Sequence, residues 1–439
     1  MQIDQTTLND LSIFQQDEEY SVFHHLNFTQ TTDGKFYLRQ ILSNPLKNIN
    51  EINDVQNAIK QLIGIHNQFP KTITNGTIMV LERFYETSIS NIPQPATHIN
   101  TFFYKLFSTA DFSLIKYSVQ HFINFINGLN KVAALLKPST SKLVQFWIDK
   151  IEVLCNRPKL QEMLKNMGEI KNTSNQTILN YAAYFRYHFK QDCLELIEVF
   201  SKIDAYMSLA IACRKHQLEF PQFVESKEPL LVTKSLFHLL LSAPTSYNIE
   251  LKKDDNFLFL TGANMAGKST FIKATGVAVY LAHIGIGVPA QQMKLSYFDG
   301  LLSNIHIVDN IFKNESYFFN EVQRVKNTVE KVGDNKKWLI LIDELFKGTN
   351  IQDAMKCSTT VIQGLQKREN GVFILSTHLY EIGNDLKQFK NIQFKYFETK
   401  INNKELEFSY QLKDGISNDR LGYLILEREG VVALLKNNT

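Results

Sequence analysis

The feature that most constrains this chain is a glycine-rich loop near its middle. The apolar run 257–260 and Thr261 are followed by Gly262-Ala263-Asn264-Met265-Ala266-Gly267-Lys268-Ser269-Thr270. A glycine, four residues and then Gly-Lys-Ser, between a strand and a helix, is typical of a phosphate-binding loop. Such a loop turns backbone N–H groups inward at a helix N-terminus, where they bind phosphate oxygens. We therefore expect Lys268 to reach the terminal phosphates of a nucleotide and Ser269 to bind Mg²⁺.

The length of the chain, 439 residues, predicts two or three domains. Residues 1–228 contain little glycine and repeat apolar residues at helical spacing, which predicts an all-α domain. Its clearest amphipathic stripe is Cys193, Leu196, Ile197, Phe200, Ile203, Met207 and Ala210. In residues 229–439, short apolar runs of strand length alternate with helical segments. This second pattern predicts an α/β domain with a mostly parallel sheet that is covered on both faces.

The composition sets few limits on the partners. A formal net charge of +3 neither requires nor excludes a polyanion, because a local basic face is sufficient to bind one. Four widely spaced cysteines form no close metal-ligand pair and favour a reducing, cytoplasmic setting. The polar start Met1-Gln2-Ile3-Asp4 is unlike a signal peptide, and no uncharged apolar run approaches the roughly 20 residues that span a bilayer. We therefore expect no membrane partner.

Two acidic residues end the next strand-like run, which is the apolar segment 339–342. Asp343 is placed to hold Mg²⁺ directly or through water, and Glu344 is placed to polarise an attacking water. A hydrophobic strand with a solvated acidic end is common in isolation. Here it follows a complete phosphate loop, and we therefore interpret the pair as catalytic.

A histidine and a serine complete this pattern. Thr377-His378 follows the strand-like run 372–376, and ATPases of the ABC type use the same order of motifs, in which the histidine contacts the γ-phosphate. Those ATPases work as face-to-face pairs, and a serine-bearing loop of one subunit completes the partner's nucleotide site. Ser316 is the candidate serine, although alone it is also a plain helix N-cap. Its segment lacks the Leu-Ser-Gly-Gly signature of transporter ATPases.

Together these motifs resemble the MutS family of DNA mismatch-repair ATPases. The Asn264-Met265 pair is distinctive of that family's phosphate loop, and Ala263 departs from it where proline is usual. The Asp343-Glu344 strand and its following turn are similar to the family's magnesium strand, with Phe346 and Lys347 where glycine and arginine are commoner. Further matches are Gly285, Val288-Pro289-Ala290, Asp309, Ser316, Phe318, Glu321, Thr377-His378, Asp414-Gly415 and Gly422.

The resemblance implies the cofactors ATP and Mg²⁺ and a homodimer through the ATPase domain. Lys268 and the loop amides would hold the phosphates, and Asn264 would help to sense the γ-phosphate. Ser269 would bind the metal together with the acidic strand. Ser316 would reach the partner's nucleotide, and Tyr410 falls where the family places a histidine that stacks on adenine.

The first half of the chain resembles, more loosely, the family's core or lever region. This match runs from Met1-Gln2-Ile3-Asp4 to Asn44-Pro45-Leu46 and Ile52. In full-length members a mismatch-reading domain and a connector precede that region, so we expect a short form that lacks both. Phe84-Tyr85-Glu86 spells the family's mismatch-wedging tripeptide, but it follows the start of the core and we interpret it as a coincidence.

The resulting hypothesis is an ATPase that binds duplex, mismatched or branched DNA and acts in mismatch repair or in handling recombining DNA. One alternative is an ATP-switched module that binds another protein. Another is the ATPase half of a transporter or chromosome-organising complex, which Asn264-Met265 and the Ser316 segment disfavour. Six basic residues could meet DNA phosphates, but acidic residues alternate with them and a solvated helical surface fits equally well. They are Lys137, Lys142, Lys150, Arg157, Lys159 and Lys165.

Overall fold

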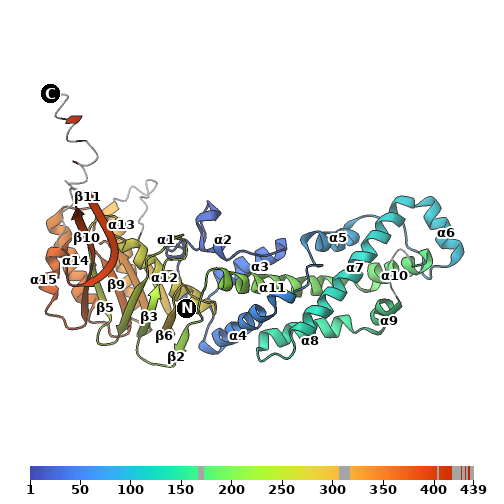
Figure 1. Ribbon diagram of the computed structural model, residues 1–439, viewed down its shortest axis with the longest axis horizontal. Helices are drawn as coiled ribbons and strands as arrows, with labels where there is room; N and C mark the ends of the chain where they lie inside the picture. Colours follow the sequence, from blue (N-terminus) through green and yellow to red (C-terminus); the bar gives the residue numbers. More distant parts are fainter. Residues whose placement is uncertain are drawn as a thin grey trace. The chain divides into compact units, whose positions relative to one another are not determined.

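The computed structural model describes residues 1–166, 173–305, 317–402 and 405–417 and the single positions 427, 431, 434 and 435. The chain forms two compact units, which we describe separately (Figure 1). The sheet unit comprises Met1–His25, Asn44–Ile52 and Lys215–Thr439, and the helical unit comprises Leu26–Ser43 and Asn53–Arg214. Over the described residues, no helix combines the length and the apolar character needed to cross a membrane.

The main sheet of the sheet unit has seven strands. In spatial order they are β1 (Gln2–Ile3), β7 (Gly300–Asn304), β8 (Trp338–Asp343), β9 (Gly371–Ser376), β5 (Phe257–Thr261), β10 (Ile392–Asn402) and β11 (Glu405–Asp414). Every neighbouring pair is parallel except β10 and β11. The strand-like runs of the sequence correspond to β5, β8 and β9, and the prediction of a mostly parallel sheet is confirmed.

Helices cover both faces of this sheet. Alternate side chains of β5, β8 and β9, such as Phe259, Ile340 and Phe373, form one core with α13 (Tyr317–Val332), α14 (Ile351–Leu365) and α15 (Gly383–Leu386). The opposite face is covered by α12 (Lys268–Ile284), where a Cβ on Gly276 would lie 2.7 Å from Leu341 Cδ1. Figure 1 shows α14 and α15 on one side of the strands and α12 on the other. Burial on both faces explains the unbroken apolar runs of these strands.

A second, smaller sheet lies in the same unit. Its order is β2 (Gln222–Val224), β6 (Gln292–Ser296), β3 (Leu230–Leu236) and β4 (Tyr247–Lys252). The loop 237–246 between β3 and β4 lines the cavity described below. Since β1 and β2 both precede residue 229, the expectation that residues 1–228 are all helical is wrong at these two strands.

The first residues of the chain are held to the main sheet. β1 pairs with β7, and α1 (Gln5–Asp10), which is N-capped by Asp4, follows directly. Asp10 Oδ2 accepts a hydrogen bond from Ser303 Oγ at 2.5 Å. Arg324 of α13 donates to Asp4 Oδ2 and to the Ser303 carbonyl, each at 2.6 Å. The two compact units therefore do not follow the predicted boundary at residue 228. The contacts described here join the N-terminal segment to the sheet unit.

The described elements of the helical unit are helices. After α2 (Val22–Leu26) they are α3 (Thr32–Ser43), α4 (Ile49–Ile65), α5 (Asn75–Glu86), α6 (His98–Phe107), α7 (Thr109–Leu135), α8 (Lys142–Cys155), α9 (Pro158–Asn166), α10 (Asn175–His188) and α11 (Lys190–Lys215). A short 3-10 turn occurs at His66–Gln68 in this unit, and two more, Glu18–Tyr20 and Tyr380–Ile382, belong to the sheet unit. The predicted stripe lies on α11 and all seven of its side chains are buried, which confirms it as a packing face.

Phe84 packs inside this unit and is not a surface wedge. Its side chain is buried on α5, and its ring meets that of Phe122 at 5.3 Å in an edge-to-face arrangement. The interpretation of Phe84-Tyr85-Glu86 as a coincidence therefore agrees with the structure.

Candidate functional site

The glycine-rich loop joins β5 to α12. Gly262 and Gly267 have φ angles of +142° and +107°, a region that residues with a Cβ rarely adopt. Gly267 is also the N-cap of α12, whose first N–H groups have no partner within the helix. The loop therefore presents backbone donors and the positive end of the helix dipole, which together favour an anion.

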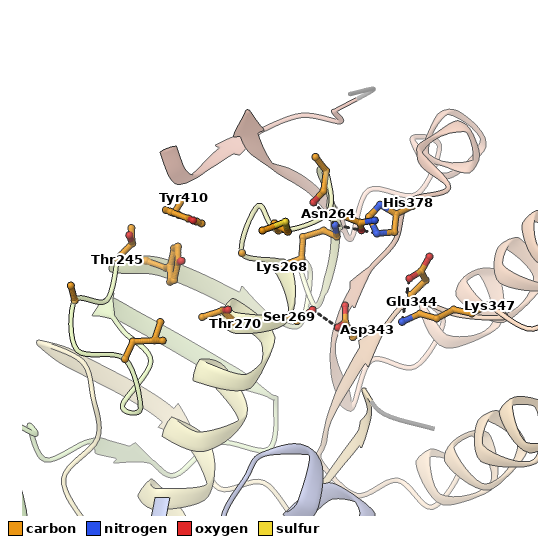
Figure 2. Close-up of a pocket in the computed structure, with 16 residues that line it drawn as sticks. Thr245, Asn264, Lys268, Ser269, Thr270, Asp343, Glu344, Lys347, His378 and Tyr410 are labelled. Carbon is orange, nitrogen blue, oxygen red and sulfur yellow. Dashed lines mark hydrogen bonds and ion pairs between the residues drawn. The ribbon is translucent and has the colours of Figure 1, made fainter. Parts of the chain in front are cut away.

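A cavity of about 540 Å³ lies over this loop. It is lined by Leu241, Ala243, Thr245, Tyr247, Ala263, Asn264, Met265, Gly267, Lys268, Ser269, Thr270, Asp343, Glu344, Lys347, His378 and Tyr410. Figure 2 shows Lys268, Ser269 and Asp343 in the middle, Tyr410 and Thr245 at one end, and His378 near Glu344 at the other. Gly262 and Ala266 shape the loop without lining the cavity, since Ala266 is buried and Gly262 lies against Phe397.

Lys268 is buried at the base of the cavity. Its Nζ donates to the carbonyl oxygens of Gly262 and Ala263 at 2.7 and 2.8 Å. Burial lowers the pKa of Lys268 to about 8, although the negative charges of Asp343 and Glu344 oppose this shift. The lysine is therefore a partly desolvated cation beside the loop amides, which favours an incoming polyanion.

Asp343 ends β8 and meets two serine hydroxyls. Ser269 Oγ donates to its Oδ2 at 2.5 Å, and Ser376 Oγ of β9 donates to its Oδ1. Parallel strands bring their carboxyl ends to one edge of the sheet, which explains how residues 74 positions apart meet. Mg²⁺ in nucleotide sites takes one or two protein oxygens and completes its shell with phosphate oxygens and water. Ser269 and Asp343 supply suitable oxygens.

The protein side chains around the cavity offer few further ligands for a metal ion. Among the residues that the structure describes, no group of three or more His, Cys, Asp or Glu side chains could hold a metal ion. The four cysteines are free thiols. The donors present therefore fit a metal that arrives with a nucleotide better than a resident metal centre.

Glu344 sits in a strained turn that is held by β9, by α13 and by an ion pair within the turn itself. Its φ is +68°, and its N–H donates to the Ser376 carbonyl at 3.0 Å. Lys347 Nζ lies 3.2 Å from Glu344 Oε2. The buried Glu321 of α13 accepts hydrogen bonds from the Lys347 and Gly348 N–H groups at 3.0 and 3.2 Å. By resemblance, Glu321 was predicted to lie with Ser316 on the loop that reaches the partner's site, and its support of this turn was not predicted.

His378 lies beside Lys268 at the end of the cavity that contains Glu344. Its Nε2 is 3.5 Å from Lys268 Nζ. Burial and the positive charge of Lys268 lower the pKa of His378. The neutral imidazole can accept a hydrogen bond from the ammonium, or can face a phosphate oxygen as a donor in its other tautomer.

Tyr410 and the loop 237–246 form the opposite end. Tyr410 lies on β11 with φ of +53°, and its ring edge would lie 3.4 Å from a Cβ on Gly267. Leu241, Ala243 and Thr245 line the same cavity, and Figure 2 shows Thr245 near Tyr410. These three residues were not predicted, because small, apolar and hydroxyl residues in a loop carry no chemical signature. Ser316, the predicted residue of the partner's site, lies outside the described residues.

Comparisons with known proteins cover most of the chain. Residues 6–210 match the family profile described as MutS domain III, and residues 258–433 match MutS domain V. DNA mismatch repair protein MSH3 of Candida glabrata is 29% identical over 319 residues, which are 70% of this chain and 29% of that protein. MutS of Thermotoga maritima is 29% identical over 246 residues, which are 55% of this chain and 30% of that protein. The chain thus spans less than a third of the length of these relatives.

Proposed function

The chain belongs to the MutS family, and on that premise we propose that it is an ATPase that couples ATP binding and hydrolysis to DNA binding. We assign the sheet unit as an ABC-type P-loop ATPase domain and the helical unit as a core or lever domain. The observation that carries the proposal is one cavity that collects Lys268, Ser269, Asp343, Glu344 and His378 from three separate segments. Two relatives named as DNA mismatch repair proteins support the DNA part.

The proposed reaction is water attack on the γ-phosphorus of ATP. The water oxygen bonds to that phosphorus, the bond to the β–γ bridging oxygen breaks, and ADP and phosphate leave. Glu344 accepts a proton from the water as it attacks. Lys268 and the loop amides bind the phosphate oxygens, and Lys347 orients the Glu344 carboxylate through the ion pair at 3.2 Å. Mg²⁺ held by Ser269 and Asp343 would neutralise charge on the phosphates.

We propose that a second copy of the chain closes the cavity through Ser316 and gives two composite sites. This part follows from the family resemblance. The partner's serine would donate to phosphate oxygens that the first copy leaves exposed, and each copy would supply one serine to the other. Mg·ATP would then favour the closed dimer, since both copies contact it.

Tyr410 is expected to hold the base of the nucleotide. Base–aromatic stacking contributes about 1–3 kcal/mol, so Tyr410→Ala should weaken Mg·ATP binding roughly 5- to 150-fold. Tyr410→Phe, which keeps the ring, should bind within about twofold of the wild-type chain. Equilibrium binding of Mg·ATP and of Mg·tripolyphosphate would be compared, because the second ligand has no base and its affinity should be equal in all three proteins. Equal ATP affinities for the alanine and phenylalanine variants would contradict stacking.

DNA binding is tested by measuring dissociation constants for homoduplex, single-mismatch and four-way-junction DNA, with and without Mg·ATP. We expect binding to at least one form, an ATP effect of about 5- to 150-fold, and an affinity that falls steeply between 50 and 200 mM salt. The same titrations would be repeated with Glu344→Gln, because this variant should hydrolyse ATP too slowly to deplete it during the measurement. No binding to any form at 50 mM salt would remove DNA from the proposal.

One observation favours the alternative, an ATP-switched module that binds a protein. Several basic residues of the helical unit that could meet DNA are engaged by acidic neighbours. The pairs are Lys137–Glu152, Lys150–Glu195, Lys159–Glu162 and Arg157–Asp192. Because these four charges are locally balanced, they add less to the unpaired basic stripe that phosphate binding favours. Absence of DNA binding together with ATP-dependent capture of a protein would support this alternative.

A further inference from the structure

An apolar stripe on α6 faces solvent in the helical unit. The stripe consists of Ile99, Phe102, Phe103, Leu106 and Phe107, and each of these residues is between 50% and 78% exposed. Other exposed apolar residues are more scattered, and no other helix that the structure describes carries as many. Scattered exposed apolar residues are normal, whereas a contiguous set marks a contact surface.

The spacing of the stripe is that of a helix face made for burial. The positions follow i, i+3, i+4, i+7 and i+8, the pattern of a helix that packs on a core. The face that α6 turns inward is more polar, with Thr101 and Tyr104 buried, and Tyr104 donates to the Ser90 carbonyl at 2.9 Å. The α6 helix is therefore amphipathic with its more apolar face outward. Burying that face against another helix would remove apolar area from water.

We propose that the α6 stripe binds the α6 stripe of a second copy of this chain, as an antiparallel helix pair about a two-fold axis near Phe103. This contact goes beyond the proposed ATPase function and does not depend on it. In such a pair Phe103 meets the partner subunit's Phe103, and the ends of each stripe meet the opposite ends of the other. A two-fold contact of this kind is self-complementary, so one exposed stripe is sufficient.

The exposed area of the stripe is large enough for a contact with a second copy of the chain. With about 200 Å² for each aromatic side chain, the exposed part of the stripe amounts to about 600 Å², the upper limit for a patch on a typical monomer. Two stripes would bury about 1,200 Å² in total, which reaches the range of specific protein interfaces. The rings of Phe103 and Phe107 are parallel, with centroids 6.0 Å apart and planes 6° apart, so the centre and one end of the stripe pack together.

The charges around the stripe favour a second copy over DNA or a lipid surface. α6 contains no acidic residue, and Lys105 is its single Lys or Arg. The Lys105 ammonium lies 5.9 Å from the centre of the Phe112 ring. A phosphate backbone requires several cations, and a helix that lies on a lipid surface carries a Lys- and Arg-rich polar face. Two uncharged stripes can pair without bringing like charges together.

The test measures self-association without nucleotide by sedimentation. The control Phe146→Asp with Val153→Asp alters two exposed apolar residues of α8, and Phe146 is as exposed as Phe103. We expect the wild-type chain and this control to dimerise at micromolar concentration. Phe103→Asp with Phe107→Asp should raise the dissociation constant at least tenfold while the thermal unfolding midpoint stays within a few degrees. A wild-type chain that remains monomeric at 50 μM overturns the proposal.

Cysteine crosslinking locates the contact and separates it from a dimer formed by the ATPase unit. Phe103→Cys would be placed in a Cys357→Ser background, because Cys357 is the one native cysteine that is not fully buried. Mild oxidation should link two copies of the Phe103→Cys chain, since cysteines next to a two-fold axis reach disulfide distance. Val153→Cys in the same background should remain monomeric on denaturing gels. No crosslink at position 103 in a dimeric sample would overturn the proposal, as would stripe-dependent binding of a monomeric chain to lipid vesicles.

Discussion

Glu344→Gln should reduce ATP turnover by about 100- to 10,000-fold, the range that a positioned general base contributes. The variant keeps the shape of the side chain and removes the carboxylate that accepts the proton from water. Its affinity for Mg·ATP should be equal to or higher than that of the wild-type chain, because a negative charge near the phosphates is lost. Steady-state phosphate release and equilibrium ATP binding measure the two effects separately.

The matched control for this variant is Glu330→Gln. Glu330 lies on α13 in the same unit, and its exposed side chain is 3.9 Å from the ammonium of Lys326. An exposed ion pair of this kind contributes at most about 1 kcal/mol, so the control should retain wild-type turnover and stability. A Glu344→Gln chain whose turnover stays within threefold of wild type, in protein free of contaminating ATPase, would remove Glu344 from the reaction.

Lys268→Met should weaken Mg·ATP binding about 100-fold or more without unfolding the protein. Removing one partner of a buried charge contact costs about 2–5 kcal/mol, which accounts for the lost affinity. The same substitution should relieve a cost in the folded protein, because it removes a buried charge. Burial lowers the pKa of Lys268 from 10.5 to about 8, which corresponds to a cost of roughly 3 kcal/mol for the charged form. Methionine removes that cost. It also leaves the Gly262 and Ala263 carbonyl oxygens without their hydrogen-bond donor, which destabilises the fold by about 1 kcal/mol for each oxygen.

The free energy of unfolding of Lys268→Met at pH 7 should therefore lie within about 2 kcal/mol of the wild-type value. Because the folded-state pKa is lowered, the cost is fully present below pH 8 and declines as the pH rises toward 10.5. Urea unfolding at pH 7 and pH 9.5 tests this prediction. The free energy of unfolding of the variant, relative to that of the wild-type chain, should be lower at pH 9.5 than at pH 7. Lys326→Met, at an exposed lysine of α13, controls for loss of a charge. Wild-type ATP affinity in Lys268→Met would contradict the assigned role.

The elements around the loop could be predicted because their constraints are local. A strand-length apolar run, two glycines in a backbone region closed to other residues, and a lysine at the first turn of α12 specify strand, loop and helix. The acidic end of β8 and His378 after β9 could also be placed, since parallel strands deliver their carboxyl ends to one edge. The roles of these residues in catalysis remain predictions.

Other features could not be predicted, because they depend on residues far apart in the chain. The loop 237–246 lines the cavity through Leu241, Ala243 and Thr245, whose residue types carry no signature. The place of Glu321 beneath the Glu344 turn depends on how α13 packs on the sheet. The apolar spacing of α6 is visible in the sequence, but periodicity cannot distinguish a face buried by the same chain from one left open.

The sequence by itself determined the glycine-rich loop between β5 and α12, the strand β8 that ends at Asp343, and the buried apolar stripe of α11, because backbone geometry and side-chain periodicity act over a few residues. Only the tertiary structure decided that the first 25 residues join the main sheet through β1 and the Arg324–Asp4 contact, and that the α6 stripe stays exposed. Hydrogen bonds and burial between distant segments depend on the whole packed arrangement, which no local pattern of residues contains.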